Sequence, residues 1–115
     1  MELTKELDSA YFIFKVGEKP IKDIFTVEGI ISLIQIKFKD KYKHESGSKI
    51  KIVIGDYVFT NEIIHNSFSE YETRKEINIR VNLHFKKESV FEFEQDEHNI
   101  NEVILYLSQL KTDEK

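Results

Sequence analysis

Two carboxylates and an imidazole are the side chains of this sequence whose types and spacing could do chemistry. Glu92 and Glu94 alternate with phenylalanines in the segment FEFE, so both carboxylates would project from one face of a β-strand. With His84 opposite them, such a set could move protons or hold a divalent metal ion. However, the E-x-E spacing is unspecific, and neighbouring Arg80 and Lys86 would balance the charge. We therefore predict a solvated, salt-bridged face here rather than a catalytic or metal site.

Motifs for other chemistry are missing from the sequence. It contains no Cys and no G-x-S-x-G, Walker or G-x-G-x-x-G motif, and none of its four histidines shows the H-x-x-x-H spacing of a helical zinc pair. We predict a protein that is not an enzyme and that uses no cofactor and no metal. A small enzyme of unrecognised type is the alternative, and it would need a deep pocket that holds His84 with Glu92 or Glu94.

A lysine-rich segment is the second candidate site. Six lysines fall within residues 37–51, opposed there by Asp40 and Glu45. Lysine alternates with apolar residues in IKFKDKYK and again in SKIKI, which places the lysines on one face of each strand. The loop HESGS between them predicts a hairpin that pairs Phe38 with Ile50. The candidate contact residues on this hairpin are Lys37, Lys39, Lys41, Lys49 and Lys51.

An acidic segment supplies a counterpart of opposite sign. Residues 88–102 contain six acidic side chains and no Lys or Arg. The chain is therefore predicted to carry a basic pole and an acidic pole, although its net charge is −4. The candidate partner-binding residues of the acidic pole are Glu92, Glu94, Asp96 and Glu97.

The basic face favours a protein partner over a nucleic acid. Stacking of bases needs aromatic side chains beside the lysines, but Phe38 and Tyr42 share the opposite, apolar face of the predicted strand. The chain has only two Arg, and its isoelectric point is about 5.6. A basic nuclease or another nucleic-acid enzyme would suit the acidic pole, and a second copy of the chain could join the two poles in a homodimer. A simpler interpretation is that exposed lysines only discourage edge-to-edge aggregation.

Composition and length predict one globular domain over residues 1–115. Hydrophobic residues make up 40% and aromatic residues 12% of the sequence, which is enough for a packed core. The first ten residues, MELTKELDSA, lack the apolar run of a signal peptide, and no run of about 18 apolar residues could span a membrane. These features predict a cytoplasmic protein without a membrane segment.

Periodicity predicts the elements that would position these candidates. Alternation indicates strands over 30–42, 49–54, 75–86 and 91–94, with a tight hairpin at Gly55-Asp56 that pairs Ile54 with Tyr57. Apolar residues at both parities of AYFIFKV, residues 10–16, predict a strand that is covered on both faces. After a turn near KKES, the strand over 91–94 would pair back on the strand over 75–86, so that His84 faces Glu92. Pro20 could open a short helix over 20–25.

The C-terminal segment has a helical pattern. Asn99 and Glu102 have the spacing of a capping box. The apolar residues that fall on one helical stripe are Ile100, Val103, Ile104, Leu107 and Leu110. The predicted fold class is therefore α+β, a mostly antiparallel sheet of five to six strands with a C-terminal helix packed on one face.

Three functions are compatible with this picture. The first is a small protein-binding domain that acts by surface complementarity, such as an inhibitor of the toxin-immunity or phage anti-defence kind. The second is a nucleic-acid accessory module that uses the lysine-rich hairpin, and the third is the small enzyme.

Overall fold

A computed structural model describes residues 3–6, 9–38, 48–63, 76–95 and 100–111 of the chain. All regular elements in these ranges are β-strands. Their bounds are β1 Leu3–Glu6, β2 Ser9–Lys15, β3 Ile21–Ile24, β4 Glu28–Phe38, β5 Ser48–Ile54, β6 Tyr57–Ile63, β7 Glu76–Phe85, β8 Val90–Gln95 and β9 Ile100–Lys111.

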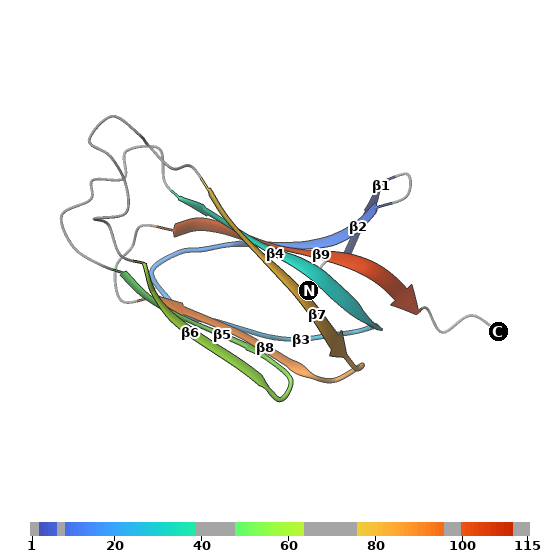
Figure 1. Ribbon diagram of the computed structural model, residues 1–115. Coiled ribbons are helices and arrows are strands. Elements are labelled where there is room, and N and C mark those ends of the chain that lie inside the picture. Colours follow the sequence, from blue (N-terminus) through green and yellow to red (C-terminus); the bar gives the residue numbers. More distant parts are fainter. Residues whose placement is uncertain (1–2, 7–8, 39–47, 64–75, 96–99, 112–115) are drawn as a thin grey trace.

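The strands form two antiparallel sheets that stack as a β-sandwich (Figure 1). The five-stranded sheet has the order β1-β2-β9-β4-β7, and the four-stranded sheet has the order β3-β8-β5-β6. Most strands that follow each other in sequence lie in different sheets, so the chain crosses repeatedly between the two layers. The antiparallel sheet that the sequence predicts is therefore confirmed, but it is divided in two.

Phenylalanine side chains fill the space between the two sheets. Phe14 from β2 stacks on Phe91 from β8 with ring centroids 4.3 Å apart, which joins the sheets directly. Phe25, in the connection between β3 and β4, is fully buried and packs against Phe85 at 4.4 Å and Phe12 at 5.6 Å. Inward-facing isoleucines of β4 and β5 complete the core, in the alternation that their spacing predicts.

The C-terminal helix of the sequence analysis is wrong, because residues 100–111 form β9, a central strand between β2 and β4. Two irregularities in its pairing with β4 explain the misleading pattern. Between Phe38 and Lys37 of β4, the partner on β9 changes from Ile100 to Glu102. Between Ile31 and Ile30 of β4, it changes from Leu107 to Gln109. One residue of β9 is therefore left without a partner on β4 at each place. Each such bulge moves the next inward position by one residue.

The inward positions of β9 are consequently spaced by three, two, two and three residues. They are Ile100, Val103, Leu105, Leu107 and Leu110, the register partners of inward residues on β4. Four of these five, all except Leu105, also fall on a helical stripe, which is why the sequence imitates a helix. The α+β fold class is thus corrected to an all-β sandwich in the described part of the chain.

Two predicted strand pairings are also wrong, because the partners lie in different sheets. Phe38 on β4 pairs with Ile100 rather than with Ile50, which lies on β5 in the other sheet. His84 on β7 pairs with Ile30, whereas Glu92 lies on β8 in the four-stranded sheet. The predicted short helix at 20–25 is replaced by β3, Ile21–Ile24.

The tight hairpin at Gly55-Asp56 is confirmed. Ile54 pairs with Tyr57, and Gly55 has a φ of 58°, in the left-handed region that glycine enters without a steric penalty. A second glycine serves close packing, since a Cβ added at Gly29 would lie 2.4 Å from the carbonyl oxygen of Gln109 on β9. Gly29 therefore allows the two central strands to approach each other.

Candidate functional site

The predicted partner-binding residues that the structure describes lie on outward-facing positions of both sheets. The outer surface of the four-stranded sheet, here called the four-strand face, carries most of them. It consists of Lys22 and Ile24 on β3, Val90, Glu92 and Glu94 on β8, Lys49, Lys51 and Val53 on β5, and Val58 and Thr60 on β6.

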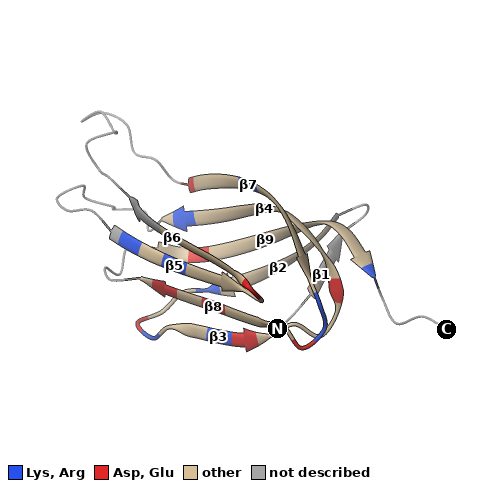
Figure 2. Cartoon of the chain, turned by 60° about the horizontal axis from the view of Figure 1, so that its bottom comes forward, with Lys and Arg blue, Asp and Glu red and all other residues tan. Residues whose placement is uncertain are grey.

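Charges on the four-strand face alternate in sign from strand to strand. Lys51 and Glu94 are register partners, and the Nζ of Lys22 lies 3.5 Å from Oε1 of Glu92. Figure 2 shows blue and red segments on β3, β8 and β5, which are neighbouring strands of the four-stranded sheet. The two separate poles expected from the sequence are therefore wrong for these residues, because the acidic strand β8 lies directly beside the lysine-bearing strands β3 and β5.

The other candidate contact residues are divided between the second sheet and the undescribed ranges. Lys37 lies on β4 of the five-stranded sheet, where its register partners are Glu102 and Glu76. It does not share a face with Lys49 or Lys51. The predictions for Lys39, Lys41, Asp96 and Glu97 fall outside the described residues.

Apolar side chains on the four-strand face were missed by the sequence analysis. Ile24 and Val58 are 52% and 57% exposed, and they lie on β3 and β6, the two edges of this sheet. Val53 and Val90 between them are half-buried. The signal was present in IVIGDYVF, where apolar residues occupy both parities, so that an inward and an outward set exist together.

The outer surface of the five-stranded sheet, here called the five-strand face, is organised in rows that cross four strands. The charged row is Lys15, Glu102, Lys37 and Glu76, on β2, β9, β4 and β7. The second row is Ile13, Ile104, Gln35 and Asn78, and the third is Tyr11, Tyr106, Leu33 and Arg80.

Direct contacts hold these rows together. Lys15 forms an ion pair with Glu102, whose residue exposure is only 9%. The Tyr106 hydroxyl donates to Oε1 of Gln35 at 3.2 Å, and Nε2 of Gln35 donates to Oδ1 of Asn78 at 3.0 Å. The five-strand face is therefore an ordered surface that combines buried charge with apolar and aromatic side chains.

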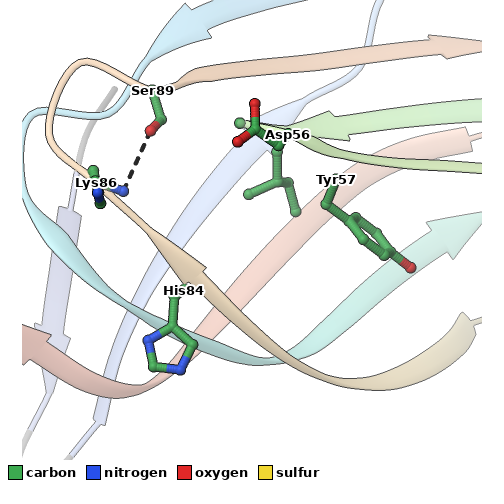
Figure 3. Close-up of a pocket in the computed structure, with 7 residues that line it drawn as sticks. Asp56, Tyr57, His84, Lys86 and Ser89 are labelled. Carbon is green, nitrogen blue, oxygen red and sulfur yellow. Dashed lines mark hydrogen bonds between the residues drawn. The ribbon is translucent and has the colours of Figure 1, made fainter.

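A pocket of about 430 Å³ lies at one end of the sandwich (Figure 3). The hairpin between β5 and β6 forms one side of it, and the turn between β7 and β8 forms the other. In that turn Oγ of Ser89 accepts a hydrogen bond from the backbone N–H of Lys86 at 3.3 Å. The lining residues are Ile54, Gly55, Asp56, Tyr57, His84, Lys86 and Ser89.

The lining side chains do not converge on one point. His84 and Tyr57 point away from Asp56 in Figure 3, and neither Glu92 nor Glu94 lines the pocket. The particular acid–base set that the sequence suggested, His84 with one of these glutamates, is therefore not assembled here.

The carboxyl group of Asp23 on β3 has a shifted pKa. Partial burial would raise the pKa of Asp23, but a hydrogen bond from the Ile24 amide and nearby positive charge outweigh it and lower this pKa below the ordinary value. No three His, Asp or Glu side chains within the described ranges are placed to hold a metal ion. The same ranges contain no helix long and apolar enough to cross a membrane.

Comparison with known proteins gives no family for this chain. No protein-family model matches it, and no curated protein is similar to it in sequence. The two outer faces of the sandwich are therefore the features from which a function can be inferred.

Proposed function

We propose that the chain is a non-enzymatic protein-binding domain that recognises a protein partner through the four-strand face. The observation that supports this most is the pair of exposed aliphatic side chains, Ile24 and Val58, on a surface whose lysines and glutamates alternate. Apolar anchors surrounded by polar side chains are the usual composition of a protein interface.

The mixed charge of this face argues for a protein rather than a nucleic acid as the partner. A nucleic acid backbone attracts a surface of one sign. Here Lys51 is beside Glu94, and Lys22 is paired with Glu92, so each of these two lysines has an acidic neighbour. A protein surface can match both signs at short range, which suits this arrangement.

An inhibitor is the narrower form of the proposal. A toxin-immunity or phage anti-defence protein would act by covering its target, and that mode of action needs only a rigid, complementary surface. The antiparallel β-sandwich provides such a scaffold, and a cytoplasmic location would accompany this role. A basic nuclease or other nucleic-acid enzyme remains the partner class for which Glu92 and Glu94 would compete with phosphate.

The test compares single aspartate substitutions on the two faces. Tagged wild-type protein is used to capture partners from the native host, and the captured protein is identified and then purified. Val58→Asp should weaken its binding at least tenfold, because a buried carboxylate at an interface is left unpaired. Ile13→Asp, an equivalent change on the five-strand face, is the matched control and should leave the affinity of a single four-strand face for the partner unchanged.

Three results would count against the proposal. Equal binding by wild type and Val58→Asp would remove the four-strand face as the contact surface. Equal loss in both variants would show that the substitutions act on the fold, so circular dichroism melting curves are recorded for each protein. Turnover of a substrate by the purified chain would replace the binding function by an enzymatic one.

A further inference from the structure

The order of charges on the five-strand face has a property that single ion pairs lack. From β2 to β7 the row reads Lys15, Glu102, Lys37, Glu76, which is plus, minus, plus, minus. When an alternating row of four charges is reversed, it reads minus, plus, minus, plus. The reversed row is therefore the electrostatic complement of the original.

A second copy of the chain can present this reversed row. If two copies face each other across a two-fold axis that runs parallel to the strands, between β9 and β4, the strand order of one copy is reversed over the other. Lys15 then lies opposite Glu76 of the second copy, and Glu102 lies opposite Lys37 of the second copy. The same contacts occur twice, as a two-fold interface requires.

The uncovered apolar side chains beside the charged row support a contact here. The sequence of β2 predicts a strand covered on both faces, but Ile13 is 38% exposed on the outer side. Tyr11, Tyr106 and Leu33, which lie in the next row of the same face, are half-buried. Exposed aliphatic and aromatic side chains next to charges are typical of an interface.

The third row also tolerates the reversal. Tyr11 at one end of that row would lie opposite Arg80 of the second copy, and Tyr106 would lie opposite Leu33 of the second copy. The first contact allows a guanidinium to stack on an aromatic ring, and the second is apolar. Stacked sheets pack about 10 Å apart, which leaves room for these side chains to interdigitate.

We propose that the five-strand face is a self-association surface, on which a second copy of this chain docks about a two-fold axis parallel to the strands. This surface is separate from the four-strand face and leaves that face open to a partner. Two copies joined in this way would present two partner-binding faces on opposite sides of the dimer.

The experiment uses charge reversal at the two ends of the row. Lys15→Glu places two glutamates opposite each other at both ends of the dimer, and Glu76→Lys places two lysines there. Each variant should dissociate at least ten times more readily than wild type in sedimentation equilibrium. The double variant Lys15→Glu with Glu76→Lys restores opposite charges at both ends and should dimerise like wild type.

Any dimerisation that is restored in the double variant must come from contacts between two molecules. Lys15 and Glu76 are separated by three strand spacings, roughly 14 Å in one chain, so they do not compensate each other within it. Mixing the two single variants provides a second readout, because every pair in the mixed dimer has opposite charges. The mixture should therefore form heterodimers although each variant alone is mainly monomeric.

Three results would overturn the inference. Wild-type protein that stays monomeric up to high concentration would remove self-association. Single variants that dimerise like wild type would remove the five-strand face from the contact. Failure of both the double variant and the mixture to restore association would refute the reversed arrangement. Val58→Asp is the control on the other face, and it should not change the dissociation constant of the dimer.

Discussion

Shortening Leu105 to Ala tests the structure of the C-terminal segment most directly. Leu105 is fully buried, and its register partners Phe12 on β2 and Ile34 on β4 are also fully buried. Removal of three carbon atoms between two central strands leaves a cavity that these neighbours cannot fill, so we expect a loss of about 3–4 kcal/mol of unfolding free energy. A domain of this size has roughly 5–15 kcal/mol in total.

The measurement is urea unfolding followed by circular dichroism. With a slope of about 1.5 kcal/mol per molar urea, the loss corresponds to a decrease of roughly 2 M in the unfolding midpoint. Leu110→Ala is the matched control, because Leu110 is only half-buried near the end of the same strand. It should cost about 1 kcal/mol.

The two structural alternatives for this segment give opposite results. In the helix that the sequence suggests, Leu110 belongs to the apolar stripe and Leu105 lies off it. A smaller loss for Leu105→Ala than for Leu110→Ala would therefore refute the strand assignment and the bulges on which it depends. An unchanged slope in both variants would show that only stability has changed.

Four further substitutions, of which Gly17→Ala is a control, test single features of the fold by the same unfolding assay. Gly29→Ala should cost about 2–3 kcal/mol, because its methyl group would lie 2.4 Å from the carbonyl oxygen of Gln109, whereas Gly17→Ala, with open space around it, should be neutral within about 0.5 kcal/mol. Gly55→Ala should cost about 1 kcal/mol, because its φ of 58° disfavours any Cβ although no atom blocks it. Lys15→Met should cost about 1–2 kcal/mol, because the exposed lysine is screened by water but its removal takes the ion-pair partner from Glu102, whose side chain is only 12% exposed.

Local pattern was sufficient to find most strands but not their partners. Strict alternation located β7 and β8, and the Gly55-Asp56 turn gave the correct register between β5 and β6. The strands that follow β4 and β7 in sequence, β5 and β8, lie in the opposite sheet instead of beside the strand that precedes them. Alternation specifies which side of a strand is apolar, and two stacked sheets satisfy it as well as one hairpin does.

The same ambiguity explains why the sequence wrongly predicted two separate charged poles. The lysines of β5 and the glutamates of β8 are far apart in sequence, so they read as two poles, and only the non-local pairing of Lys51 with Glu94 makes them neighbours. Opposite charges at this range cancel each other's field within a short distance. Recognition by the four-strand face would then depend on contact with Ile24 and Val58 rather than on long-range attraction. A charge map drawn along the sequence overestimates the polarity of a sheet protein wherever basic and acidic strands are paired.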